Sequence, residues 1–381
     1  MTGASLTIEE YSEFDQIHAY VDAWNSLVDR EGYGPALRPD WLQSVWMEKG
    51  TGKRLVIKVI RSGDQCVGFA PFVFHRENRK GVPVRIVQPL SMLNQLHGTQ
   101  MVVASDFREA VVGSVLRSLG QPKQHWDLLL MYLSASDIQT RCLLDHFRSA
   151  HLRYVVQPGM SPPFMNVTGT WDELMAGLQS RFRSTLRSRE RRLREKARVE
   201  LRYHDSPDDT AQGLRAIEEI ESRSWKHDTG LPITDPSHWG FYQRYAQRAA
   251  QASMLRLPIL YLNDEPVAYD YGLIHQGVYY LLQTSYKDEW KADFPGFVLR
   301  KLLIEDLTRV GIRQINFGGD ATEWKMKWTN QKQRYDSYLV FGRSVRGLYL
   351  RKTYSFGEEA RAGVHSSAVG ASPGIEGDID E

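Results

Sequence analysis

The sequence predicts a mixed α/β (α+β) protein built from two tandem domains, each a mostly antiparallel mixed sheet flanked by helices. The chain has 381 residues, too many for one ordinary hydrophobic core and enough for two. Short apolar segments of strand length alternate with longer segments of helical period. The order hairpin, helix, strand occurs twice, which indicates a duplication. We expect an N-terminal domain over residues 1–163, a C-terminal domain over 164–355 and a disordered tail over 356–381.

The first half begins with an amphipathic helical segment, residues 14–27. A turn at Arg61-Ser62-Gly63-Asp64 then joins two apolar segments, which is the pattern of a hairpin. The expected strands are 54–60, 66–74, 84–87, 100–103 and 127–133, and the expected helices are 110–119 and 138–150. Gly159, Pro162 and Pro163 interrupt the pattern and mark the domain boundary.

The second half repeats this order. Long helical patterns come first, and the turn Asn263-Asp264-Glu265-Pro266 then joins two strands of a second hairpin. The expected helices are 171–198, 214–225 and 297–310, and the expected strands are 254–262, 267–274, 278–286, 313–317 and 337–341. Both halves therefore place a hairpin before a helix and a following strand.

Composition excludes several classes of protein. The chain is 42% hydrophobic and 25% charged with a formal charge of +2, so it folds without demanding a polyanionic partner, and any basic site is local. Cys66 and Cys142 lie far apart in the sequence and are expected to be buried free thiols. The histidines show no i,i+4 pairing, so we expect no metal site.

The N-terminal residues show no basic-then-apolar pattern of a signal peptide. No segment approaches the roughly 18 apolar residues of a membrane span. We therefore expect a cytoplasmic protein, either free or peripheral at the inner face of the membrane.

The segment Phe294-Pro295-Gly296-Phe297 opens the helix at 297–310. Pro and Gly at a helix start leave the first N–H groups unpaired and free of bulky side chains, which suits a pyrophosphate. The alternative is an ordinary loop-to-helix connection. The position favours an anion site, because the segment follows three expected antiparallel strands and precedes another strand.

Four short stretches resemble one known family. They are Ser224-Trp225-Lys226, Pro266-Val267-Ala268, Phe294-Pro295-Gly296, and Gly319-Asp320 followed by Trp324-Lys325. Together with the order of elements they resemble the CelD-type, FemAB-related acetyltransferases of the GNAT superfamily, with two GNAT-like domains. In that family the last stretch usually carries Tyr where this chain has Trp324, and the usual glycine-rich pyrophosphate loop is missing here.

The resemblance implies an acyltransferase that moves an acyl group, acetyl above all, from acyl-CoA to an amine or hydroxyl. It implies acetyl-CoA or another acyl-CoA as co-substrate, no metal, and a sugar or cell-surface polysaccharide precursor as acceptor. FemAB-like relatives use aminoacyl-tRNA instead, so that donor remains the alternative. A catalytically silent assembly or membrane-surface protein is the third hypothesis.

On this fold, strands 278–286 and 313–317 are expected to splay and admit the thioester arm. A backbone N–H group between Thr284 and Tyr286 would then stabilise the oxyanion. The residues expected to bind the donor are Thr284, Ser285, Pro295, Gly296, Phe297 and Lys325. The residues expected to contact the acceptor are Trp225, Lys226 and Tyr271.

Direct attack by the acceptor needs a general base. Asp270 is the first candidate, because a lone carboxylate interrupts an apolar strand there, although a solvent-facing position would explain it as well. Asp320 is the second candidate, and its alternative role is to cap the helix at 322–327. Tyr286 completes the catalytic set. The sequence has no Gly-x-Ser-x-Gly motif, so a covalent serine mechanism is not supported.

The segment 181–198 combines an apolar stripe with nine arginines and lysines. Its basic face is either solvated or binds a phosphate-bearing ligand or an anionic membrane surface. Nucleic acid is the least expected partner.

Overall fold

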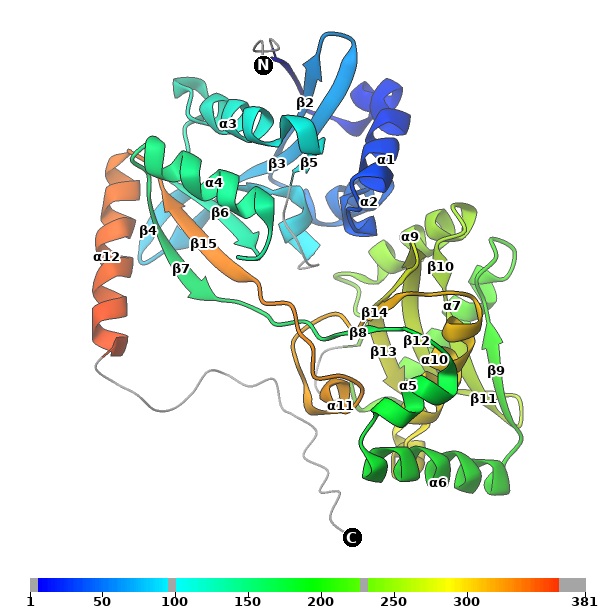
Figure 1. The fold of residues 1–381 in the computed structure, drawn as a ribbon. Coiled ribbons are helices and arrows are strands. Elements are labelled where there is room, and N and C mark those ends of the chain that lie inside the picture. The colour runs from blue at the N-terminus through cyan, green and yellow to red at the C-terminus, as the bar shows by residue number, and fades with distance from the viewer. Residues whose placement is uncertain (1–5, 95–100, 227–231, 363–381) are drawn as a thin grey trace.

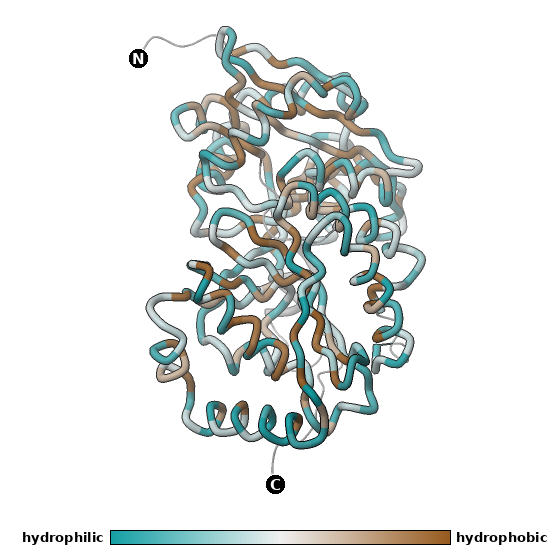
Figure 2. Tube along the Cα trace, turned by 90° about the vertical axis from the view of Figure 1, so that its right-hand side faces the viewer, coloured by the Kyte–Doolittle hydropathy of each residue, from teal (hydrophilic) through white to brown (hydrophobic). Residues whose placement is uncertain are grey.

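The computed structural model describes residues 6–94, 101–226 and 232–362 (Figure 1). Two sheets form two bodies, one toward each end of the molecule, and a shared hydrophobic core, in which the Trp41 ring packs edge-on against Phe241 at 4.9 Å, joins them. The apolar segments lie inside these bodies, and the hydrophilic helix α6 (Ser180–Lys196) runs along one outer end (Figure 2).

The first sheet has the strand order β1-β2-β3-β4-β6-β15-β7, with β5 paired to β3. Its strands are β1 (Leu6–Tyr11), β2 (Arg54–Ser62), β3 (Gln65–Arg79), β4 (Val82–Pro89), β5 (Val102–Val103), β6 (Leu128–Leu133), β7 (Arg153–Pro158) and β15 (Asp336–Phe341). Its helices are α1 (Val21–Arg30), α2 (Pro39–Lys49), α3 (Arg108–Leu119), α4 (Ile138–Ser149) and α12 (Val345–Ala362).

The second sheet has the order β8-β14-β13-β12-β11-β9, with β10 paired to β12. Its strands are β8 (Phe164–Asn166), β9 (Val199–Tyr203), β10 (Leu255–Arg256), β11 (Pro258–Leu262), β12 (Glu265–His275), β13 (Val278–Tyr286) and β14 (Gln314–Asn316). Its helices are α5 (Trp171–Gly177), α6, α7 (Thr210–Glu221), α9 (Trp239–Gln251), α10 (Pro295–Arg309) and α11 (Glu323–Met326).

The two sheets share one topology. In each, four antiparallel strands are followed by a helix and by a fifth strand parallel to the fourth: β4, α3 and β6 in the first sheet, and β13, α10 and β14 in the second. In each, helices separate the first strand from the second: α1 and α2 in the first sheet, and α7 and α9 among the described residues of the second. The predicted fold class, two mixed and mostly antiparallel sheets flanked by helices, is therefore confirmed.

The last strand differs from its predicted place. β15 pairs with β6 and β7 of the first sheet, although the sequence analysis assigned residues 337–341 to the C-terminal domain. Periodicity identifies a strand but carries no information on which distant strand it pairs with. The tail differs as well, because α12 continues to Ala362, and the remainder of the expected disordered segment lies outside the described residues.

The predicted helix over 171–198 is two helices. Thr170 and Glu173 form a capping box that starts α5, and the backbone at Leu178 is extended, with φ −78° and ψ 156°. α6 then begins at Ser180. This break lets α6 turn away from α5 and lie over the start of α10.

Two chain segments that run side by side connect the sheets. Phe164 N donates to Gln331 O at 3.1 Å, Gln333 N to Pro162 O at 3.0 Å and Tyr335 N to Met160 O at 3.0 Å. The chain thus leaves the first sheet after β7 and returns to it before β15 along an antiparallel pair. This double connection ties the second sheet to the first.

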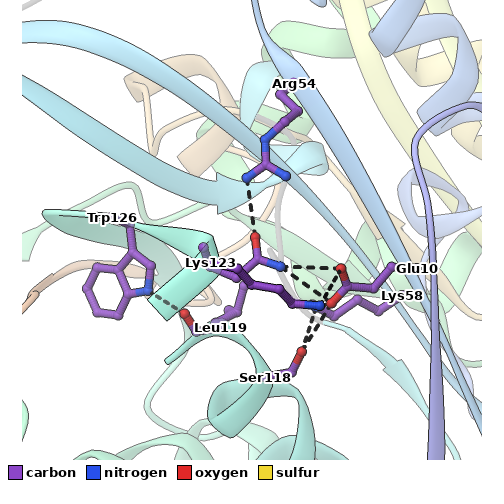
Figure 3. A network of polar contacts seen from close by, with 8 residues as sticks. Glu10, Arg54, Lys58, Ser118, Leu119, Lys123 and Trp126 are labelled. Carbon is purple, nitrogen blue, oxygen red and sulfur yellow. Dashed lines mark hydrogen bonds and ion pairs between the residues drawn. The ribbon is translucent and has the colours of Figure 1, made fainter. Parts of the chain in front are cut away.

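A buried polar network fixes α3 to the first sheet (Figure 3). The fully buried Lys58 Nζ donates to Glu10 at 2.5 Å and to Ser118 Oγ at 2.8 Å, and Trp126 Nε1 donates to Leu119 O at 2.8 Å. Burial lowers the pKa of Lys58, and the Glu10 carboxylate opposes that shift. Because the ammonium group has partners from β1 and α3, this network holds those elements together.

Candidate active site

β13 and β14 diverge in the middle of the second sheet. They pair in parallel over three positions, Val278 with Gln314, Tyr279 with Ile315 and Tyr280 with Asn316. Beyond Tyr280, residues 281–286 of β13 still pair with β12 on one side. On the side where β14 paired, no described strand pairs with them. The predicted splay of these two strands is present.

A β-bulge lies where the strands part. Tyr271 is opposite Gln283 and Gly272 is opposite Leu281, so Leu282 is the extra residue. A bulge disrupts the ladder locally and leaves a backbone group without its usual partner. At Leu282, therefore, backbone N–H and C=O groups of β13 lie at an open strand edge. Leu282 is two residues before Thr284, which was predicted to bind the donor.

The loop after β14 closes over this point. Gly318 has φ +60°, and a Cβ there would lie 2.4 Å from Leu281 O, so only glycine fits. Gly318 N donates to Asn316 Oδ1 at 2.9 Å. The loop 318–320 is thus packed directly against the bulged strand.

Lys325 holds that loop from the inside. Its Nζ donates to Gly318 O at 2.6 Å and to Asp320 O at 3.1 Å. Burial, helped by nearby Arg300, lowers the pKa of Lys325 to about 8. Lys325 was predicted to bind the donor, and in the structure it binds backbone carbonyls of the loop.

Asp320 is exposed at the end of the same loop. Its Oδ1 accepts from Ser161 N and Ala321 N, both at 2.9 Å. These bonds fix the loop to the segment that crosses between the sheets. Asp320 does not cap α11, whose N-cap is Thr322, so the alternative considered for it does not hold.

Asp270 is fully buried and faces α10. Arg300 of α10 donates to both of its oxygens, from Nη2 at 2.5 Å and from Nε at 3.2 Å, and to Thr284 Oγ1 at 3.1 Å. Burial raises the pKa of Asp270, and the Arg300 guanidinium acts in the opposite direction. The Trp324 ring covers the guanidinium at 4.3 Å. Asp270 therefore neither faces solvent nor is a lone carboxylate.

The opposite face of β12 and β13 carries a second polar group. Lys226 Nζ lies 3.5 Å from Gln283 Oε1 and 3.9 Å from Glu221, and Gln283 Nε2 donates to Tyr242 Oη at 3.0 Å. Tyr269 Oη donates to Glu221. Burial lowers the pKa of Lys226, and the Glu221 carboxylate opposes that shift.

Three predicted residues also lie on this face or beside it. Tyr271 is fully buried and donates to Tyr242 O at 3.0 Å, so it supports α9 and presents no surface to an acceptor. Ser285 is buried, and its hydroxyl has no hydrogen-bond partner among the described residues. Trp225 is half-buried beside Lys226. The first domain approaches the same face, because the Tyr280 hydroxyl lies 3.5 Å from the position of a Cβ on Gly34.

The start of α10 lies where the sequence placed it. Phe294 is in the left-handed region with φ +53°, Pro295 is the first helical residue, and no side chain caps the helix. A Cβ on Gly296 would meet only the Tyr286 ring of the described residues, at 3.6 Å, and the N–H groups of Phe297 and Val298 donate to Phe294 O at 3.0 and 3.3 Å. Burial raises the pKa of Tyr286.

α6 covers this helix start and leaves a cavity of about 290 Å³. Arg189 stacks on the Phe294 ring at 4.2 Å and donates to Ala292 O at 2.9 Å, and Phe182 packs edge-on against Phe297 at 5.7 Å. The cavity is lined by Gln179, Arg181, Phe182, Thr185, Leu186, Arg189, Phe294, Phe297, Glu323 and Lys327. Three cations and one carboxylate make it basic, and its other walls are aromatic or apolar.

The bulge in β13, the splay of β13 and β14 and the start of α10 all lie within a segment that matches a family model. Residues 180–326, from α6 to α11, match the model of the acetyltransferase (GNAT) domain. The match covers 147 of the 381 residues and indicates that this segment is a GNAT-type domain. We refer to residues 180–326 as the GNAT domain. A search of curated proteins finds no match.

Solved structures resemble the whole two-domain chain. FemX has 13% identity and a TM-score of 0.58, with 86% of this chain and 96% of FemX covered. The C-terminal domain of a putative lysylphosphatidylglycerol synthetase from Agrobacterium fabrum has 10% identity and a TM-score of 0.53, covering 93% and 98%. A protein of unknown function from Bacteroides thetaiotaomicron has 14% identity and a TM-score of 0.52, covering 88% and 100%. At these identities the likeness concerns the fold.

The sequence did not reveal the partners within the GNAT domain. None of Arg300, Glu221 and Gln283 was predicted as a site residue, and each of them contacts a predicted residue. The sequence could have indicated Arg300, because this charged residue interrupts the apolar face of the helix that packs on the sheet. In the described parts of the chain, no group of three or more metal-binding side chains gathers, and no helix is long and apolar enough to cross a bilayer.

Proposed function

We propose that this GNAT protein transfers an acyl group, acetyl above all, from an acyl-CoA to an amine or hydroxyl by direct attack. The observation that carries the proposal is the bulge at Leu282, placed at the splay of β13 and β14 beside the open start of α10. A backbone N–H at the bulge would stabilise the thioester oxyanion. The start of α10 would bind the donor's pyrophosphate through the Gly296 N–H and the helix dipole, because the N–H groups of Phe297 and Val298 already donate to Phe294 O.

The cavity under α6 would accept the nucleotide end of the donor. Arg181, Arg189 and Lys327 supply positive charge, and Phe294 and Phe297 supply aromatic rings for a base to contact. These residues extend the predicted set of Pro295, Gly296 and Phe297. The mechanism needs no metal, because the backbone N–H supplies the oxyanion stabilisation.

Charge reversal at Arg181 and Arg189 is expected to weaken acyl-CoA binding by roughly 10- to 100-fold, since each cation would contact a phosphate through a charge-assisted bond. Thermal shift and isothermal calorimetry with acetyl-CoA measure this. The matched control is Arg187→Glu/Arg192→Glu, which reverses two charges of the same helix that do not line the cavity. If no acyl-CoA raises the melting temperature of the wild-type protein, the hypothesis of a CoA donor is wrong.

The alternative donor is an aminoacyl-tRNA. The exposed arginines of α6 beside the cavity favour it, since they could contact a polyanion beyond a single nucleotide. Steeply salt-dependent tRNA binding, together with no effect of acyl-CoA, would establish this donor in place of CoA. The same Arg187→Glu/Arg192→Glu variant would then lose affinity and would no longer serve as a control.

We propose Asp320 as the base that accepts the acceptor's proton. Oδ1 is held by two backbone N–H groups, which leaves Oδ2 exposed beside the loop that closes over the bulge. Asp270 fits this role less well, because Arg300 bonds both of its oxygens. Trp225 and Lys226, on the face that the first domain approaches, would contact the acceptor.

Asp320→Asn is expected to reduce kcat by about 10²- to 10⁴-fold, the usual contribution of a general base. The amide oxygen still accepts from Ser161 N and Ala321 N, so the melting temperature and the affinity for acetyl-CoA should stay as in wild type. Steady-state kinetics and thermal denaturation measure both. An unchanged kcat would exclude Asp320 as the base.

The acceptor we propose is the amine or hydroxyl of a sugar in a cell-surface polysaccharide precursor, and we place the protein in the cytoplasm. The support for both is the resemblance of the four short motifs to their family. Acetyl-CoA consumption measured with a panel of amino sugars, nucleotide sugars and amino acids tests the acceptor class. Turnover confined to amino acids would contradict it.

A further inference from the structure

α12 carries an apolar strip that faces away from the protein. Val345 is 85% exposed, Leu348 53% and Tyr349 43%, and their i, i+3, i+4 spacing places them on one face of the helix. The other large exposed apolar side chains of the described residues are scattered over different elements: Met47, Ile138, Val156 and Val310. A contiguous strip of this kind marks an interaction surface.

The helix itself is firmly docked, so the strip is a fixed feature. Leu350, on the opposite face, is fully buried in the cluster with Val84, Val155, Leu339 and Phe341. Ser344 Oγ donates to the buried Asp127 at 2.6 Å. Figure 1 shows α12 at the outer edge of the first domain, with the sheet on one side of it.

The surroundings of the strip are basic. Residues 343–354 contain Arg343, Arg346, Arg351 and Lys352 and no aspartate or glutamate. Arg346 and Arg351 are exposed and form no ion pair with any described side chain. The tip of the β3–β4 hairpin adjoins α12, since Tyr349 Oη donates to Lys80 O at 3.2 Å, and it adds Arg76, Arg79 and Lys80 against Glu77.

We propose that this face of α12 binds the surface of an anionic lipid membrane. An exposed Val-Leu-Tyr strip flanked by arginines has the composition of a helix that lies in the headgroup region, with the apolar side chains inserted and the cations on anionic headgroups. A second copy of the chain fits this face less well. A two-fold interface would oppose the same cations to one another without a carboxylate between them.

Sedimentation with vesicles tests the proposal without reference to catalysis. The wild-type protein is expected to bind phosphatidylcholine vesicles that contain about 30% phosphatidylglycerol, to bind pure phosphatidylcholine weakly, and to dissociate near 1 M salt. Arg346→Glu/Arg351→Glu should weaken binding by about 25-fold or more, at roughly fivefold for each cation lost. Leu348→Glu should weaken it as well, because it removes an inserted side chain.

Two matched variants locate the effect. Val310→Glu replaces an apolar residue that is 60% exposed at the end of α10, and Arg187→Glu/Arg192→Glu reverses two exposed charges of α6. Both are expected to bind vesicles as wild type does. Three results would overturn the proposal: no preference for anionic vesicles, an equal loss in the α6 variant, or self-association that Leu348→Glu abolishes while vesicle binding is absent. These measurements do not test the acyltransferase proposal, because none of them uses an acyl donor or an acceptor.

Discussion

Asp270→Asn is expected to lower the free energy of unfolding by about 3–5 kcal/mol, the usual cost of removing one partner of a buried ion pair. Asp270 is fully buried and receives two bonds from Arg300, whose side chain is 6% exposed. The substitution leaves the guanidinium buried under Trp324 with one charge uncompensated. Urea denaturation followed by circular dichroism measures the loss. A change below about 1 kcal/mol would mean that the pair is solvated in solution.

This loss complicates any test of Asp270 in catalysis, because an unfolded variant is inactive for a trivial reason. The double variant Asp270→Leu/Arg300→Met resolves it. Replacing a whole buried pair by apolar residues is often neutral or stabilising, so the double variant should recover most of the stability lost in Asp270→Asn. If it folds and retains kcat, the pair is structural. If it folds and loses activity, Asp270 or Arg300 also positions the reacting groups.

The sequence was informative where local pattern determines structure. The strands at 267–274 and 278–286, the entry at Pro295 and the duplication all rest on periodicity or turn chemistry, and they appear in the fold. The sequence did not show which distant residues lie close together in the fold. The place of β15 depends on its pairing with a strand more than two hundred residues away in the sequence. Asp270 was interpreted as a lone carboxylate because its partner Arg300 is thirty residues away on another element.

The same limit applies to the candidate site. The sequence located the segment 284–297 and predicted an oxyanion contact at Thr284–Tyr286, but it did not reveal the bulge at Leu282. A bulge depends on the register of two strands, which residue types alone do not determine. Lys325 and Thr284 had the right chemistry for a ligand, yet Lys325 binds loop carbonyls and Thr284 accepts a bond from Arg300. The Gly318-Gly319 pair was a usable signal, since adjacent glycines at a strand end indicate a close backbone approach.

Gly318→Ala is expected to destabilise the protein by about 2–4 kcal/mol and to reduce kcat/KM by about 100-fold or more. The positive φ of +60° strains an alanine, and its Cβ would lie 2.4 Å from Leu281 O, so the loop or the bulged strand has to move. A displacement of about 1 Å at a reacting centre is enough for such a loss of rate. Thermal denaturation and steady-state kinetics with acetyl-CoA measure the two effects.

Gly311→Ala separates the strain from the clash. Gly311 also has positive φ, +77°, at the end of α10, and a Cβ there would meet no atom within 4 Å. Its substitution should therefore cost only about 1 kcal/mol and leave kcat/KM unchanged. If both variants lose the same stability and Gly318→Ala remains active, the position of the loop 318–320 does not affect the bulged strand. If Gly318→Ala alone loses activity, the contact between Gly318 and Leu281 is what holds the loop in register with the bulged strand, and acyl transfer depends on that register.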